Sequence, residues 1–169
     1  AGAGRRFGAA HRPLLVSVRS GAGHSMPGMM NTVLNLGINP AVAAALASET
    51  KDARYAADTH RRFIEQYRKV VLGGHSDPVP VDPWDQLRAA VAAVFDSWYS
   101  PRARAYRSNR GLANDSGTAV TIQAMVFGNL DERSGTGVLF SRNPITGEAP
   151  AWGEWLLRGQ GEDVVAGDH

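Results

Sequence analysis

An arginine stands where a short apolar segment gives way to a glycine-containing loop. Residues 14–18 (LLVSV) are apolar and rich in β-branched side chains, which predicts a buried strand. Arg19 follows this strand directly, and the loop over residues 20–31 holds three glycines, which let backbone approach a ligand closely. A guanidinium at that point can hold two phosphate oxygens in a fixed fork. From residue types alone, a surface pair between Arg19 and a carboxylate is the competing interpretation.

The second feature is the methionine-rich segment MPGMM, residues 26–30, inside the same loop. Thioether side chains are flexible and polarizable, which suits a flap that folds over an aromatic base or a phosphate chain. Met30 is the methionine that we expect to contact such a ligand. A plug of methionines in the core beneath a turn accounts for the same residues, and the physical chemistry leaves both interpretations open.

A row of four arginines lies in residues 102–110: Arg102, Arg104, Arg107 and Arg110. Clustered positive charge raises the hypothesis of nucleic-acid binding. Only Tyr106 supplies an aromatic platform in this row, and the row occupies one short segment. We therefore do not expect nucleic-acid binding, and a solvated helix face is the simplest interpretation of the row.

The helical part of the pattern begins at Pro40 and extends to about residue 72. An alanine-rich stretch predicts one helix, and apolar residues at three-to-four spacing predict the next: Phe63, Tyr67, Val70 and Val71. Gly73 and Gly74 end this pattern. The proline-rich segment 75–83 is predicted to be a linker between a first lobe, residues 1–74, and a second lobe, residues 84–169.

The second lobe is predicted to start with helices and to continue with strands. Asp82 as N-cap and Pro83 at the first helical position start one helix, and Ser100 with Pro101 restarts another. We expect the first of these helices to turn a common apolar side to the core: Leu87, Val91, Val94, Phe95 and Trp98. The strands follow at residues 119–127, 138–141 and 153–157. The order of elements predicts an α+β fold.

The composition excludes several classes of site. The 169 residues contain no cysteine, so disulfides and thiolate sites are absent. A net charge of +2 excludes a protein whose overall charge strongly attracts polyanions. The five histidines show no metal-ligand spacing, so no metal site is predicted within this chain. The sequence shows neither a signal peptide nor an apolar run long enough to span a bilayer, and a cytoplasmic location is the default expectation. Because the chain starts with Ala1 rather than Met, we expect a piece of a longer protein.

Three long motifs in one order carry a resemblance to a known family. They are VSVRSGAGHSMPGMMNTVLNLG (residues 16–37), QAMVFGN (123–129), and SGTGVLFSRNPITGE with GEWLLRGQGEDVVAG (134–167). Together they resemble the nucleotide-binding domain of pyruvate, phosphate dikinases. The resemblance implies part of an ATP-grasp fold, with ATP and Mg²⁺ as cofactors.

The resemblance also implies roles for individual residues. Arg19 would lie on the ATP phosphates as the catalytic cation, while Thr136 and Glu162 would belong to the same ATP site. Residues 123–126 would form the strand that reads adenine through main-chain groups. On this strand, the resemblance implies that Gln123, Met125 and Val126 contact the nucleotide. Without the resemblance, Thr136 is an ordinary strand residue and Glu162 a solvated loop charge.

The resemblance further implies what lies outside this chain. The family's phosphate-binding lysine and its magnesium carboxylates have no counterpart here, since Lys51 and Lys69, the only lysines, fall in predicted helices. We therefore expect no turnover from the isolated chain. The partner would be the phosphohistidine domain of the parent protein, with Arg102 and Glu154 as candidate docking residues.

One position departs from the family pattern. Relatives commonly carry an arginine after SGA, whereas this chain has Gly23 and His24. The departure removes or replaces a cation on the phosphate side. The family implies a phosphotransferase that makes phosphoenolpyruvate; the alternatives are a phosphoenolpyruvate synthase-like or rifamycin phosphotransferase-like enzyme, or a non-catalytic binding module.

Overall fold

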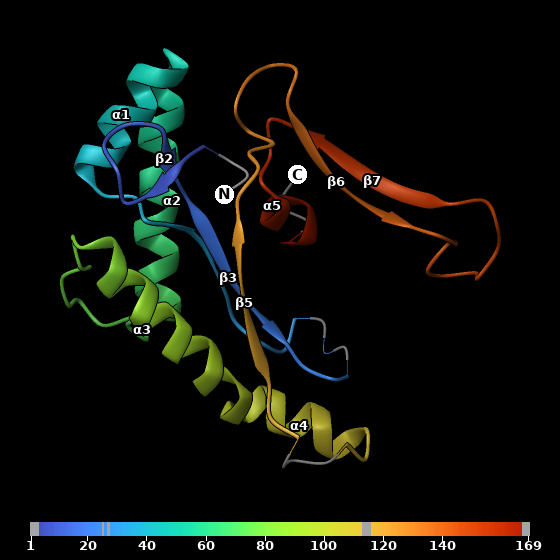
Figure 1. Cartoon of the computed structure of the whole chain (residues 1–169). Helices are drawn as coiled ribbons and strands as arrows, with labels where there is room; N and C mark the ends of the chain where they lie inside the picture. Colours follow the sequence, from blue (N-terminus) through green and yellow to red (C-terminus); the bar gives the residue numbers. More distant parts are fainter. Residues whose placement is uncertain (1–3, 25, 27, 113–115, 167–169) are drawn as a thin grey trace. The chain divides into compact units, whose positions relative to one another are not determined.

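The computed structural model describes residues 4–24, 26, 28–112 and 116–166 (Figure 1). Two compact units make up the chain, Ala1–Met125 and Val126–His169. Helices combine with antiparallel sheets, which confirms the α+β class. Ser25 and Pro27 of the predicted glycine and methionine loop lie outside the described residues, and so does His169. The described part contains no helix that is long and apolar enough to cross a membrane.

The first unit is built on a three-stranded antiparallel sheet in the order β4-β3-β5. Its strands are β3 (Val16–Gly21), β4 (Thr32–Leu36) and β5 (Ala119–Ala124). The predicted strands at 14–18 and 119–127 correspond to β3 and β5, with ends that differ by several residues. Strand β4 was not predicted. A short parallel pair, β1 (Arg6–Phe7) with β2 (Pro13–Leu14), completes the strands of this unit.

Among the described residues, this unit also contains four α-helices and one 3-10 turn, and each α-helix begins at a side-chain cap. They are α1 (Pro40–Thr50), α2 (Ala53–Val70), α3 (Pro83–Asp96), η1 (Ser97–Tyr99) and α4 (Pro101–Asn109). The N-caps Asp82 and Ser100 accept hydrogen bonds from first-turn N–H groups, which confirms both predicted helix starts. Lys51, predicted to be helical, is instead the left-handed C-cap of α1 with φ 58°, because the chain turns there into α2.

The core of the first unit lies between the sheet and the helices. Helix α2 packs on β4, and α3 packs on β3, β4 and β5. On α2, Phe63 and Tyr67 are fully buried, as the periodicity predicts. The core side predicted for α3 is partly wrong, because the buried stripe runs one position earlier along the helix. Gln86, Ala90 and Val94 form this stripe, while Phe95 is 44% exposed.

The segment 75–83 belongs to the first unit. The Gln86 side chain donates to the Pro80 carbonyl at 2.8 Å, and Asn39 Nδ2 donates to the Val81 carbonyl at 3.1 Å. These bonds hold the segment against the helices on both sides of it. The predicted boundary at 75–83 therefore does not coincide with the division into compact units, which follows Met125.

The second unit contains a hairpin and a short helix. Strands β6 (Gly135–Phe140) and β7 (Trp152–Leu157) pair antiparallel, and α5 (Gly161–Ala166) packs on both. The hairpin confirms the strands predicted at 138–141 and 153–157, whereas α5 was not predicted. On one face of the hairpin Leu139, Trp155 and Leu157 are 79%, 72% and 54% exposed, and glycines stand opposite each of them.

Candidate nucleotide-binding site

Arg19 lies on the face of the first unit's sheet that points away from the helices. Alternate residues of a strand point to opposite faces, and the neighbouring Val18 is fully buried in the core. The Arg19 side chain is exposed, and none of the described residues forms an ion pair with it. The competing interpretation, a surface pair with a carboxylate, therefore finds no partner within the described part of the chain.

The register of β3 and β5 brings Gln123 to the same face as Arg19. Arg19 stands opposite Thr121, and Ser17 stands opposite Gln123. Directly opposed residues of an antiparallel pair share a face. Arg19, Thr121 and Gln123 are all exposed, so this face offers a guanidinium, a hydroxyl and a carboxamide to a polar ligand.

The chain leaves the sheet at Met125. Its backbone N–H donates to the Leu15 carbonyl at 3.0 Å, and its sulfur lies 3.0 Å from the Asn35 backbone nitrogen as a hydrogen-bond acceptor. The main-chain donor of Met125 is thus already used, while Val126 is 95% exposed. Of the segment predicted to read adenine, Gln123, Ala124 and Val126 are exposed and Met125 is half-buried.

The methionines of the loop pack on η1 and α4. Met26 is 8% exposed and clusters with Trp98 and Ala103, and Met30 is partly buried against this cluster. The Ser97 hydroxyl donates to the Val94 carbonyl at 2.6 Å, accepts from the Asn31 backbone N–H at 3.2 Å and lies 3.9 Å from the Met30 sulfur. This arrangement matches the core plug that the sequence left open, and contact of Met30 with a nucleotide stays a prediction.

Thr136 and the start of α5 lie close together in the second unit. A Cβ built on Gly161 would lie 3.9 Å from the Thr136 hydroxyl oxygen, and Glu162 is the next residue. Both Thr136 and Glu162 are half-buried. Glu162 was predicted in a loop, but it occupies the first turn of α5, where a carboxylate is favoured by the helix dipole.

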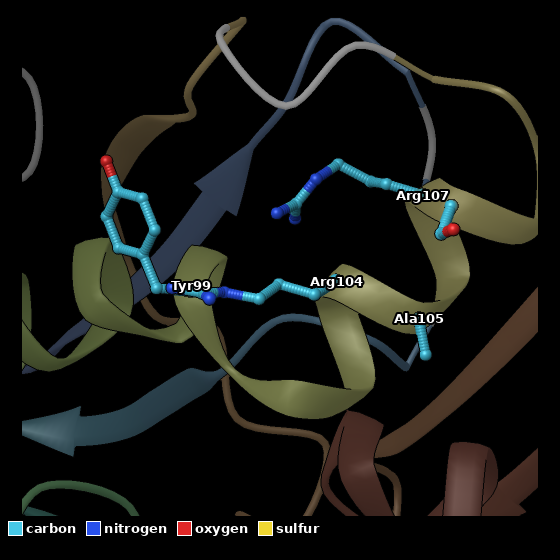
Figure 2. A pocket seen from close by; sticks show the side chains of 5 residues that line it. Tyr99, Arg104, Ala105 and Arg107 are labelled. Carbon is cyan, nitrogen blue, oxygen red and sulfur yellow. The ribbon is translucent and has the colours of Figure 1, made fainter.

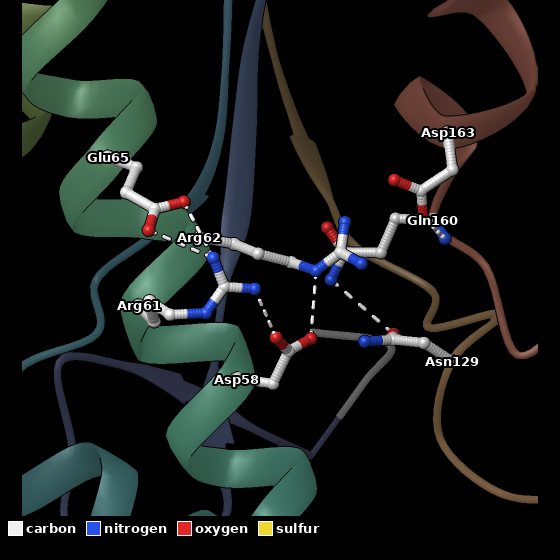
Figure 3. Close-up of polar contacts among 7 residues, drawn as sticks. All are labelled: Asp58, Arg61, Arg62, Glu65, Asn129, Gln160 and Asp163. Atoms are coloured by element: carbon white, nitrogen blue, oxygen red, sulfur yellow. Dashed lines mark hydrogen bonds and ion pairs between the residues drawn. The ribbon is translucent and has the colours of Figure 1, made fainter. Parts of the chain in front are cut away.

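A buried amide pair that the sequence did not predict supports this region. Gln160 Nε2 donates to Asn129 Oδ1 at 3.4 Å, and the two residues are 3% and 8% exposed. The Gln160 backbone N–H also donates to Asp163 Oδ2 at 2.8 Å (Figure 3). The signal in the sequence was the position of these residues in two motifs of the resemblance: Asn129 ends QAMVFGN, and Gln160 lies within GEWLLRGQGEDVVAG.

The comparisons with known proteins decide the family. The model of the pyruvate phosphate dikinase AMP/ATP-binding domain matches residues 2–169. The chain belongs to this family. It is 46% identical over 207 residues to pyruvate, phosphate dikinase of Rhizobium meliloti (strain 1021), and the match covers 97% of this chain and 23% of that protein.

Two further relatives carry the same name. Pyruvate, phosphate dikinase 2 of Zea mays is 46% identical over 207 residues, which cover 97% of this chain and 23% of that protein. Pyruvate, phosphate dikinase of Clostridium symbiosum is 44% identical over 208 residues, which cover 97% and 24%. The chain thus spans about a quarter of the length of these dikinases. The ATP-grasp assignment fits this membership.

The magnesium ion that the dikinase family implies requires a cage of oxygen ligands, usually carboxylates with water and phosphate. The described residues contain no group of three or more histidine, aspartate or glutamate side chains that could hold a metal ion. The acidic residues of α2 are engaged otherwise: Asp58 pairs with Arg61 and Arg62, and Glu65 pairs with Arg61 (Figure 3). The described part of the chain does not fit a complete magnesium site.

The two candidate docking residues lie in different units. Arg102 is exposed in the first turn of α4, and Glu154 is exposed in the middle of β7 opposite Val138. Both side chains are accessible to a partner domain. Their role in a dikinase stays a prediction.

Proposed function

We propose that this chain binds ATP for a pyruvate, phosphate dikinase, with Arg19 holding the phosphates. The observation that carries the proposal is the position of Arg19: an exposed guanidinium on a polar sheet face, shared with Gln123 and without an ion-pair partner among the described residues. A guanidinium that keeps its donors for a ligand can bind two phosphate oxygens at once. Family membership supplies the ligand, since the family is described as AMP/ATP-binding.

The other predicted residues have roles that suit their chemistry. The Thr136 hydroxyl can donate to a phosphate oxygen, and the Glu162 carboxylate can accept from a ribose hydroxyl or orient a cation. The segment 123–126 would read the adenine edge, and the shape of Met125 and Val126 would favour the flat base. Met30 would close over the nucleotide. Magnesium, when bound, neutralises phosphate charge, and its ligands are expected in other parts of the parent protein.

For the parent protein we propose the reaction that the family resemblance implies. ATP would pass its two terminal phosphoryl groups to a histidine of a separate domain and release AMP. Inorganic phosphate would take the outer group as diphosphate, and the histidine would pass the remaining phosphoryl group to pyruvate. The overall products with inorganic phosphate would be phosphoenolpyruvate, AMP and diphosphate. Because the relatives reported above are named pyruvate, phosphate dikinases, this reaction is favoured over that of a phosphoenolpyruvate synthase. A cytoplasmic location stays a prediction, since another relative, of Zea mays, is named as chloroplastic.

Isothermal titration of the complete polypeptide with Mg-ATP tests the role of Arg19. Replacing Arg19 by alanine removes a charge-assisted hydrogen bond, so we expect the dissociation constant to rise about tenfold to a hundredfold. The matched control is Arg110→Ala, which removes an exposed arginine from the end of α4. Unchanged ATP affinity in Arg19→Ala, or an equal loss in both variants, would show that Arg19 does not hold the phosphates.

We propose further that Arg102 and Glu154 dock the phosphohistidine domain. Charge reversal at either exposed residue, Arg102→Glu or Glu154→Lys, is expected to slow phosphoryl transfer to the histidine while ATP binding stays intact. Titration with Mg-ATP and single-turnover transfer are measured on the same preparations. Loss of ATP binding instead would assign these residues to the nucleotide site or to the fold.

A further inference from the structure

A hollow of about 460 Å³ lies along one side of α4 in the first unit. Its lining consists of Tyr99, Arg104, Ala105, Arg107 and Ser108. Figure 2 shows the side chains of Arg104 and Arg107 extending from α4 in the same direction, toward Tyr99. The lining thus combines two arginines with two hydroxyl-bearing side chains and contains no carboxylate.

Arg104 is the accessible cation of this hollow. Its side chain is exposed, and no described residue forms an ion pair with it. The guanidinium carbon lies 5.8 Å from the centroid of the Tyr99 ring. A cation at that distance from an aromatic ring is attracted to it, so the contact with Tyr99 restrains the guanidinium in the lining of the hollow.

Arg107 forms the part of the lining beside Arg104, and its position is fixed by buried contacts. This residue is 2% exposed, its Nη1 donates to the Trp98 carbonyl at 2.8 Å, and its guanidinium carbon lies 3.9 Å from the Trp98 ring centroid. Trp98 is itself buried in the cluster with Met26 and Ala103. This part of the lining is therefore fixed by core packing, and it does not have to form when a ligand arrives.

The hollow shares no residue with the predicted nucleotide site or with the docking candidates. Arg19, Gln123 and Thr136 lie on strands, whereas every lining residue belongs to η1 or α4. On α4 itself, Arg102 and Arg104 are two positions apart, which places them about 200° apart around the helix axis. Arg102 thus points to a different side of α4 from the hollow.

We infer that this hollow is a second anion site, which binds a small phosphate-bearing molecule separately from ATP. The Arg104 fork contacts the phosphate oxygens, and the hydroxyl of Ser108, one turn further along α4, donates to a further oxygen. Two or more linked anionic groups suit the hollow better than one, because its volume exceeds the space that a single phosphate fills. Inorganic diphosphate is the simplest probe of this chemistry.

The test is isothermal titration with inorganic diphosphate of the complete polypeptide saturated with a non-hydrolysable ATP analogue and magnesium, so that the nucleotide site is filled, at low ionic strength, where exposed charges are least screened. Arg104→Ala is expected to weaken diphosphate binding about tenfold or more. Arg104→Lys keeps the charge without the fork, so an intermediate affinity is expected. Ser108→Ala is expected to cause a smaller loss than Arg104→Ala.

Two control variants distinguish binding in the hollow from general attraction to positive charge and from binding at the nucleotide site. Arg110 stands at the end of the same helix, its guanidinium carbon lies 5.3 Å from the Tyr106 ring centroid, and it does not line the hollow. Arg110→Ala is therefore expected to leave diphosphate affinity unchanged. Arg19→Ala is expected to weaken binding of the ATP analogue and to leave diphosphate binding in the hollow unchanged. Absence of diphosphate binding to the unmodified protein, equal losses in the Arg104 and Arg110 variants, or loss only in the Arg19 variant would each overturn the inference.

Discussion

The Gln86 side chain accepts a hydrogen bond from the Gly37 backbone N–H at 3.0 Å, in the centre of the first unit. The same carboxamide donates to the Ile38 carbonyl at 2.9 Å and to the Pro80 carbonyl at 2.8 Å. Gln86 is 1% exposed. One buried side chain thus joins the end of β4, the approach to α1 and the segment 75–83.

Replacing Gln86 by methionine keeps the side-chain length and removes all three bonds. Because buried backbone groups then lose their partners, the free energy of unfolding is expected to fall by about 3 kcal/mol. Urea denaturation measures this change. The matched control is Gln123→Met on the exposed sheet face, which should stay within about 0.5 kcal/mol of the unmodified protein. Equal effects at the two positions would contradict the assigned role of Gln86.

Asp58 predicts a dependence of stability on pH. Burial raises the pKa of its carboxyl, but hydrogen bonds from Arg61 and Arg62 outweigh burial and leave the pKa below its usual range. A lowered pKa in the folded state stabilises the protein above the unfolded pKa, about 3.9, and this contribution is lost as pH falls through the folded value. Asp58→Asn should therefore cost up to about 1 kcal/mol at pH 7, after allowance for solvent screening.

The measurement for Asp58 is urea denaturation of both proteins at pH 7 and at pH 3. The difference between Asp58→Asn and the unmodified protein should shrink at pH 3, where the unmodified carboxylate is increasingly protonated. Asp77→Asn is the control, since Asp77 is exposed and shows no ion pair within the described residues. A difference that stays constant between the two pH values would refute a stabilising role of these ion pairs.

The tryptophans predict two contrasting fluorescence signals. Trp98 is 4% exposed beneath the methionine loop, and Trp155 is 72% exposed on the hairpin. Single-tryptophan variants, with the other three replaced by phenylalanine, would isolate each signal. We expect Trp98 to emit at shorter wavelength and to be quenched several-fold less by acrylamide than Trp155. Similar quenching of both would show that the Met26 and Ala103 cluster does not exclude solvent.

The departure at Gly23 and His24 predicts a gain in nucleotide affinity on substitution. His24 is exposed in the loop that follows Arg19, so His24→Arg adds a permanent charge where relatives commonly carry one. ATP binding is expected to tighten about threefold to fivefold, as one exposed charge allows. Titration with Mg-ATP measures this effect, and His75→Arg in the segment 75–83 is the control. No gain in ATP affinity, or the same gain in both variants, would show that this loop does not lie beside the ATP phosphates.

Local patterns in the sequence predicted the starts of α3 and α4, whereas α5 was not predicted. Asp82 and Ser100 cap helix starts through hydrogen bonds that reach only two or three residues along the chain, so residue type and spacing suffice to predict them. The periodic apolar residues of α2 determined its buried side in the same way. Motifs in family order determined the family, and the candidate nucleotide residues rest on those motifs rather than on periodicity.

Only the tertiary structure showed which side chains are brought together by segments that lie far apart in the sequence. Arg19 and Gln123 share a face because β3 and β5 pair in one register, and nothing local to either strand fixes that register. Burial of Gln86 in place of an apolar residue depends on carbonyl and N–H groups that β4 and the segment 75–83 bring to it. The sequence thus determined the starts of α3 and α4 and the family, and long-range packing determined which side chains meet.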